Sequence, residues 1–146
     1  MKYILVVLSV VVLVLAASAQ AQDTLVGTWN IVGENYPFIG ITVFTGSGAV
    51  IENDTTNINP ITSQSISMGT WHKTGGLNYA FDEENYLYDT SGNLIYIAVS
   101  DCTLTLAPKG KSYSDSCAVS FYTCSLSSCP GTLAGTNTVT ATGTRF

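Results

Sequence analysis

Two sets of side chains have the composition of a reactive or ligand-binding site. They are a run of three carboxylates, Asp82-Glu83-Glu84, and a lone histidine, His72. Such groups serve calcium binding, glycosidase chemistry or a Ser-His-Asp triad. The carboxylate run lacks the spacing of an EF-hand calcium loop. Adjacent residues of a strand point to opposite faces, so these carboxylates are poorly placed to act together as a glycosidase pair. No nucleophile-elbow motif accompanies His72. We therefore predict a solvated strand break and an exposed histidine, and assign no catalytic residue, metal site or cofactor; a triad assembled from distant residues stays open.

Aromatic side chains are the better indication of function. They fall on alternate positions of several predicted strands, so that they share a face. An aromatic lining with a few hydroxyl groups is typical of a pocket for an apolar ligand, although such residues more often belong to an ordinary core. The candidates for lining such a pocket are Phe44, Trp71, Tyr79, Phe81, Tyr96 and Phe121.

Four cysteines lie in the last third of the chain: Cys102, Cys117, Cys124 and Cys129. In a secreted chain an even number of cysteines indicates disulfides, and four cysteines can pair in three ways. A hairpin turn centred on residues 109–110 places Cys102 opposite Cys117, within disulfide reach. Cys124 and Cys129 would then close a short loop. A redox or zinc site is the alternative, but the lone histidine is distant in sequence.

The first residues have the pattern of a secretory signal peptide. A positive start at Lys2 precedes an apolar stretch from Ile4 to Leu15 and then small residues up to Ala21. The apolar stretch is shorter than the roughly 20 residues that a bilayer-spanning helix needs. We predict a signal peptide over 1–21 and one domain over 22–146, secreted without membrane insertion, or periplasmic or on the cell surface in a bacterium.

Charged residues are sparse and mostly acidic, with ten acidic against five basic residues and a formal net charge of −5. The sequence has no basic patch for nucleic acid or for an anionic membrane, so neither is a predicted partner. Asn53-Asp54-Thr55 is an acceptor sequence for N-glycosylation at Asn53. It begins a stretch, Asp54 to Ser63, that we predict to be a polar loop.

The region after the signal peptide reads almost entirely as strands, because apolar and polar residues alternate between turn-forming Gly, Pro, Asn and Asp. The predicted strands are Leu25–Val32, Phe38–Phe44, Ala49–Glu52, Ile66–Lys73, Leu77–Tyr88, Leu94–Leu106, Tyr113–Tyr122 and Thr136–Arg145. Consecutive strands tend to pair, and a sheet this long curls until its edges meet. We predict an all-β, antiparallel, up-and-down barrel of eight strands, with a two-sheet β-sandwich as the alternative.

Two Gly-x-Trp triplets favour the barrel: Gly27 with Trp29, and Gly69 with Trp71. Residues two apart on a strand share a face, so each glycine leaves room beside an indole for another segment to approach. Two such places indicate a sheet that curls back on itself.

The first triplet, together with Arg145 on the last predicted strand, resembles the lipocalins and the wider calycin superfamily. The resemblance implies a tryptophan at the closed end of the barrel with the arginine lying across its ring. The second triplet and the closing Gly143-Thr144-Arg145 make the chain similar to small secreted lipocalin-like domains of unassigned function. The residues assigned to barrel closure are Gly27, Trp29, Gly69, Gly143 and Arg145.

Three functions suit such a barrel. A secreted, non-catalytic protein that binds a small apolar or amphipathic ligand would have an open cavity rimmed by aromatic residues. An isomerase-type enzyme would add a buried polar group with a perturbed pKa. A structural or surface extracellular protein would have a filled interior. We favour the first, with a small hydrophobic ligand as the partner; the sequence does not specify an oligomeric state.

Overall fold

The computed structural model describes residues 24–55, 61 and 63–146, and the predicted signal peptide lies outside them. The described residues form strands, turns and loops, and none of them is in a helix. No helix suited to crossing a bilayer is therefore found in this part of the chain. The strands are β1 (Gly27–Gly33), β2 (Ile39–Phe44), β3 (Ala49–Asp54), β4 (Ser63–Gln64), β5 (Ser67–Gly75), β6 (Asn78–Tyr88), β7 (Leu94–Leu106), β8 (Ser112–Thr123) and β9 (Leu133–Arg145).

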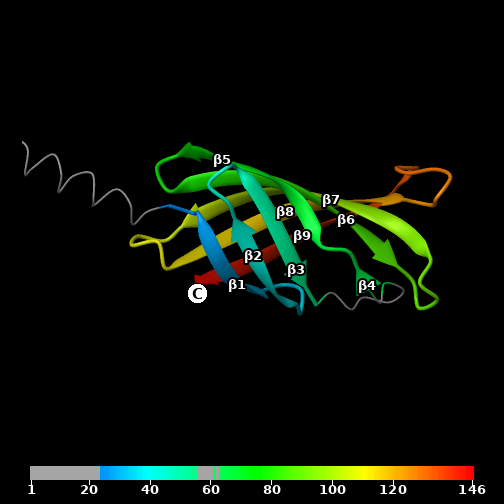
Figure 1. The fold of residues 1–146 in the computed structure, drawn as a ribbon, viewed down its shortest axis with the longest axis horizontal. Coiled ribbons are helices and arrows are strands. Elements are labelled where there is room, and N and C mark those ends of the chain that lie inside the picture. Colours follow the sequence, from blue (N-terminus) through cyan, green and yellow to red (C-terminus); the bar gives the residue numbers. More distant parts are fainter. Residues whose placement is uncertain (1–23, 56–60, 62) are drawn as a thin grey trace, which may run out of the picture.

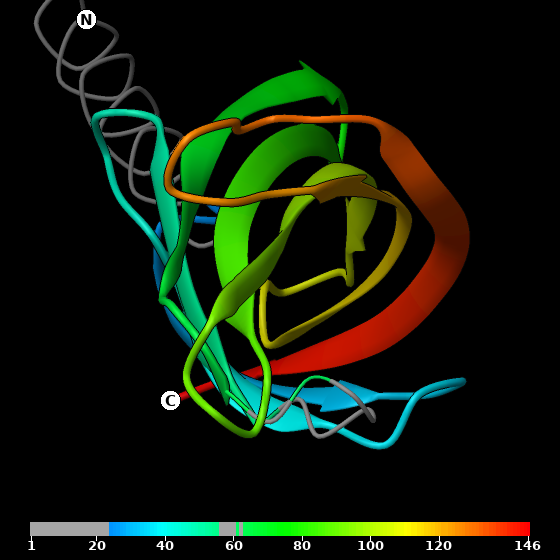
Figure 2. The ribbon, with the colours of Figure 1, turned by 90° about the vertical axis from the view of Figure 1, so that its right-hand side faces the viewer.

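All pairings are antiparallel, and eight of the strands close into a barrel (Figures 1 and 2). Around the barrel the order is β1-β2-β3-β5-β6-β7-β8-β9, and β9 returns to β1. The two-residue strand β4 lies outside this ring and pairs with the end of β6. The up-and-down barrel is therefore confirmed, and the alternative of a two-sheet sandwich is wrong.

The first and last strands are joined in the register that the barrel requires. Trp29 pairs with Arg145, and the ladder continues to Gly33 and Ala141. Closing the ring in this way leaves the main-chain groups of β1 and β9 bonded on both sides. A closed sheet has no edge strand with unpaired backbone N–H and C=O groups, and this is the physical advantage of a barrel over an open sheet.

Two details of the predicted strands are wrong. Strand β6 runs without a break through the carboxylate run, because strict alternation keeps Asp82 and Glu84 exposed while Glu83 turns inward. The predicted polar loop is shorter than expected, since β3 continues to Asp54 and β4 begins at Ser63. Residues 56–60 and 62 lie outside the described part of the chain.

The barrel has a closed end and an open end. At the closed end, on the left in Figure 1, short turns join β5 to β6 and β7 to β8. At the open end, on the right, lie β4 and the connection from β8 to β9. We call the buried apolar cluster at the first end the closed-end core: Leu25, Trp29, Ile31, Phe44, Val50, Tyr79, Phe81, Cys102, Leu104, Leu106 and Tyr113. The open-end cluster consists of Ile61, Leu87, Ala98 and Val119.

Trp29 lies in the middle of the closed-end core and is fully buried. Its indole N–H donates to the carbonyl oxygen of Leu25 at 2.9 Å, and the Tyr113 ring meets it edge to face at 5.0 Å between centroids. The guanidinium carbon of Arg145 lies 4.6 Å from the indole centroid, and Arg145 Nη2 donates to the carbonyl oxygen of Thr24. Thr24 and Leu25, which precede β1, and Arg145 of β9 thus cover this end of the barrel.

Glycines permit close approaches around the barrel. A Cβ on Gly69 would collide with the carbonyl oxygen of Asp82 on the neighbouring strand, and a Cβ on Gly143 would enter the ring of Tyr113. Gly27 has a φ of 147°, a value that residues with side chains rarely adopt. These glycines therefore let strands and rings pack closer than any larger residue allows.

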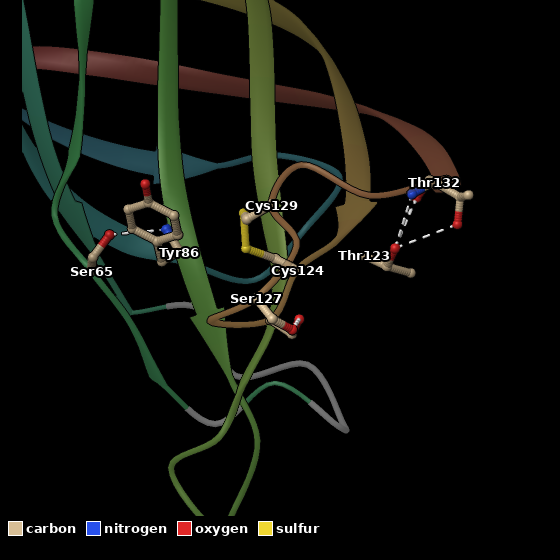
Figure 3. The surroundings of a disulfide bond; sticks show 8 residues. Ser65, Tyr86, Thr123, Cys124, Ser127, Cys129 and Thr132 are labelled. Carbon is tan, nitrogen blue, oxygen red and sulfur yellow. Dashed lines mark hydrogen bonds between the residues drawn. A yellow bond between two sulfur atoms is a disulfide. The ribbon is translucent and has the colours of Figure 1, made fainter.

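The cysteines form two disulfides. Cys102 and Cys117 face each other on β7 and β8, with a Cα–Cα distance of 4.0 Å. Cys124 and Cys129 join the two sides of the open-end loop, at a Cα–Cα distance of 4.5 Å (Figure 3). Both are the pairs that hairpin geometry predicts, and the described residues include no free cysteine.

Candidate functional site

A cavity of about 120 Å³ lies inside the barrel, between the closed-end core and the open-end cluster. On β6 the inward rings stop at Phe81, and the inward positions beyond it carry Glu83, Asn85 and Leu87. The apolar residues that line the cavity are Ile31, Phe38, Ile61, Phe81, Leu87, Ala98, Val119, Phe121, Val139 and Ala141. The barrel interior is therefore not filled along its whole length.

Three carboxyl groups line the middle of this cavity: Glu52 of β3, Glu83 of β6 and Asp115 of β8. Each carboxyl group points inward, because the residue two positions before it on the same strand is buried. These preceding residues are Val50, Phe81 and Tyr113. Strand alternation thus places three acids in the interior, where carboxylates are rare unless they are paired or used. Asp54, two residues after Glu52, lines the same cavity.

Glu52 is held by a hydroxyl group. Thr42 Oγ1, fully buried on β2, donates to Glu52 Oε2 at 2.7 Å. Burial raises the pKa of Glu52 well above its ordinary value, and the negative charge of Glu83 raises this pKa further. The hydrogen bond from Thr42 lowers it, but it does not offset the loss of water.

Glu83 is the least satisfied polar side chain of the cavity. Its Oε2 atom is shielded from solvent and has no hydrogen-bond partner. Burial raises the pKa of Glu83 to about 8, and the charges of Asp54, Asp115 and Asp82 act in the same direction. Glu83 therefore holds a proton at neutral pH when the cavity is empty.

Asp115 accepts one backbone hydrogen bond, from the Ala141 N–H at 3.0 Å. Burial raises the pKa of Asp115 to about 7, while that hydrogen bond lowers it and the charge of Glu34 raises it. Beside it, burial also raises the pKa of Tyr113 above its ordinary value, followed by the charges of Asp115 and Glu52. Tyr113 thus stays a neutral phenol, and Asp115 is divided between its two forms near neutral pH.

None of the described basic side chains lines the cavity. Lys73 lies 5.6 Å from the Tyr79 ring centroid at the closed end, and Arg145 covers the Trp29 indole. His72 is exposed on β5, as predicted, and both lysines of the β7–β8 turn are exposed. The acidic groups of the cavity consequently have no countercharge from these side chains.

Hydrogen-bonded amides lie at the mouth of the cavity. Asn85 Nδ2 donates to Gln64 Oε1 at 3.1 Å, and Gln64 Nε2 donates to Asp54 Oδ1. These bonds connect β6, β4 and β3, so the short outlying strand positions polar groups at the entrance. Tyr36 and Phe38, from the β1–β2 connection, also line the cavity, and Phe38 packs against the closed-end core.

The structure separates the six predicted pocket residues. Phe81 and Phe121 line the cavity. Phe44 and Tyr79 are buried in the closed-end core and Trp71 packs against it, while Tyr96 packs against the open-end cluster.

Sequence reasoning missed the three carboxyl groups of the cavity. The signal that could have found them is the alternation itself, since Tyr79, Phe81, Glu83, Asn85 and Leu87 share one face of β6. An acidic residue at a position of the strand that otherwise carries inward apolar side chains indicates a buried carboxyl group. Here the exposed acids Asp82 and Glu84 on either side make this pattern hard to see in the sequence.

Two further sequence predictions concern the surface and metals. Asn53 is exposed on β3, opposite Ile41, so its predicted glycosylation would fall on the outer face of a strand. Within residues 24–55, 61 and 63–146, no group of three or more His, Cys, Asp or Glu side chains is arranged to hold a metal ion. Glycosylation of Asn53 stays a prediction.

Comparison of this chain with the models of known protein families, with curated proteins and with solved structures found no match. The geometry of the barrel and its cavity therefore carries the functional argument.

Proposed function

We propose that this protein is a secreted, lipocalin-like carrier that binds a small amphipathic molecule inside its barrel. The observation that supports this proposal is the cavity, which has apolar walls, a polar middle and a closed-end core beneath it. Small-molecule sites combine an apolar lining with a few convergent polar groups in this way. Under this proposal the protein makes and breaks no covalent bond in its ligand.

The size of the cavity limits the ligand. A volume of about 120 Å³ is close to that of a cavity known to take benzene, roughly 150 Å³. It is well below the roughly 300–1,000 Å³ of sites for drug-sized ligands. The ligand would therefore be a single ring or a short chain carrying one polar group.

Secretion and membership of the calycin superfamily are part of the proposal. Two disulfides are typical of chains that fold in an oxidising compartment. The Trp29–Arg145 stacking and the eight-stranded barrel are compatible with a lipocalin-like fold.

Acid–base catalysis on a small lipid or similar substrate is a second candidate. The observation that favours it is the pKa of Glu83, raised to about 8, because a buried carboxylic acid that keeps its proton at neutral pH can donate it. An enzyme of this kind would return a changed molecule, whereas a carrier would return the same one.

Native mass spectrometry of the purified protein tests the carrier. We expect a bound species in the wild type that is lost in Ala98→Leu, which fills the cavity, and kept in Ala118→Leu, whose exposed side chain lies on the neighbouring strand. Released ligand should be re-bound with its mass unchanged; a change of mass on incubation would favour the enzyme. Protein of bare mass that also takes up neither benzyl alcohol nor benzylamine would contradict both candidates.

A further inference from the structure

We propose that the molecule carried by this barrel is a small organic cation, an amine whose ammonium group lies among Glu52, Glu83 and Asp115. Its apolar part would face the walls of the cavity between those carboxyl groups and the mouth. This inference rests on the proposed function and adds the chemical class of the ligand.

The first argument is a missing hydrogen-bond partner. Glu83 Oε2 is buried and has no partner, and once Glu83 has lost its proton this oxygen can only accept hydrogen bonds. Leaving such a group unsatisfied is costly, and native proteins rarely do so without a functional reason. An ammonium group carries three N–H donors and no acceptor, so it supplies what this position lacks.

The second argument is charge. Glu52 and Asp54 face the cavity from β3, Glu83 from β6 and Asp115 from β8. The acidic groups that act on them from nearby are Asp82 and Glu34, and the neutral phenol of Tyr113 lies beside them. No described basic side chain lines the cavity, so a cation that enters it meets four acidic side chains and no positive charge, in a cavity where their electrostatic attraction is stronger than in water.

The walls of the cavity select an organic cation over a metal ion. The described acids are not arranged as a metal site. Phe81 and Phe121 line the cavity with aromatic rings, which attract an ammonium through their faces and pack against the carbon skeleton beside it. A monocyclic amine fits the volume available.

Binding of a cation would release protons. In the empty barrel the pKa values of Glu83 and Asp115 are raised to about 8 and about 7, chiefly by burial, so these groups are largely protonated below those values. A neighbouring ammonium favours their ionised forms and lowers both pKa values. Affinity for an amine should therefore increase as pH rises from about 6 to about 8, while an alkyl amine with a pKa near 10 stays charged.

Isothermal titration calorimetry of the protein with benzylamine and with benzyl alcohol, its neutral counterpart, tests the inference. At pH 8 we expect benzylamine to bind at least tenfold more tightly. At pH 7, titration in two buffers of different ionisation enthalpy should show proton release for benzylamine alone. Glu83→Gln should lower the affinity for benzylamine at least tenfold and should reduce the preference for benzylamine over benzyl alcohol. Glu84→Gln, which alters the adjacent exposed acid, should change neither.

These measurements distinguish a failure of the amine inference from a failure of the proposed carrier function. Equal affinity for both probes in the wild type would overturn the inference and leave the proposed carrier intact. Binding of neither probe, with no co-purified ligand, would overturn the carrier and the inference with it. Displacement of benzylamine by calcium chloride at equal concentration would overturn the amine in favour of a metal ion. If Glu83→Gln fails to fold, the two wild-type titrations still decide the question.

Discussion

The closed-end core and the cavity are built from the same strands, but their charged side chains have different surroundings. In the core, the Trp29 indole N–H donates to Leu25. The Arg145 guanidinium lies over the indole face and donates to Thr24 through Nη2, although its Nε atom is buried without a partner. In the cavity, Glu83 Oε2 has no partner. Ring packing and cation–π contact around Trp29 therefore contribute stability, whereas the buried carboxyl groups of the cavity, which have no such packing around their charge, reduce it.

Replacing the central tryptophan should give the largest effect. Trp29→Ala removes a fully buried ring, its hydrogen bond and its contact with Arg145, and should lower the free energy of unfolding by about 3–5 kcal/mol. Trp71→Ala is the matched control, because Trp71 also donates to a backbone carbonyl, at 3.0 Å, but is only half-buried. Urea unfolding measures both. Equal losses would contradict the central place of Trp29 in the closed-end core.

The two disulfides extend the comparison to the open-end loop. Cys102 and Cys117 are 15 residues apart and should contribute about 3 kcal/mol by restricting the unfolded chain. Cys124 and Cys129 are 5 residues apart and should contribute about 2 kcal/mol. Double Cys→Ser variants of each pair, compared by urea unfolding, check the order. A larger loss for the loop pair would show that the open end contributes more to stability than its exposure indicates.

Two glycines on β9 compare the ends directly. Gly143→Ala would force a methyl group into the Tyr113 ring that packs on Trp29, and should cost about 1–3 kcal/mol. Gly135→Ala, on the same strand near the open end, meets nothing within 4 Å. Thermal unfolding should show a lowered midpoint for the first variant and little change for the second. A similar loss in both would mean that the contact with the Tyr113 ring is not responsible.

The cavity should make the empty protein less stable as pH rises. Below about 4.5 both the folded and the unfolded chain keep the Glu83 proton, and between about 4.5 and about 8 the unfolded chain alone releases it. The free energy of unfolding should therefore fall with pH in this window, by up to about 1.4 kcal/mol per pH unit for one such group. Asp115, with its pKa raised to about 7, acts in the same direction.

Urea unfolding at pH 5, 6, 7 and 8 measures this slope. Glu83→Gln should flatten it and make the empty protein more stable at pH 8. The exposed neighbour supplies the control, since Glu84→Gln should leave the slope as it is. A slope unchanged by Glu83→Gln would mean that Glu83 titrates normally in the folded protein.

The fold could be predicted from the sequence because its signals are local and repeated. Alternation and turn residues defined the strands, and a hairpin centred at 109–110 was enough to pair Cys102 with Cys117. The stacking of Arg145 on Trp29 followed from the resemblance and is present.

The cavity could not be predicted in the same way, because its volume depends on how side chains from many strands meet. Glu83 was interpreted as part of a solvated strand break because it belongs to a run of three acids, whereas strand alternation turns it inward. Phe44 and Tyr79 were predicted to line the pocket because an aromatic lining is typical of one. Aromatic residues more often belong to a core, and in the structure both lie in the closed-end core.

The pairings between neighbouring strands differ in length, and this difference affects the solubility of the protein. Only four residue pairs, Ala49–Thr70 to Glu52–Ser67, join β3 to β5, whereas eleven join β7 to β8. A fluctuation that separates β3 from β5 would expose the unpaired backbone N–H and C=O groups of both strands. In a chain of which only 10% of residues are charged, such groups template pairing between molecules. We therefore expect β3 and β5 to be where aggregation begins when the protein is concentrated or warmed.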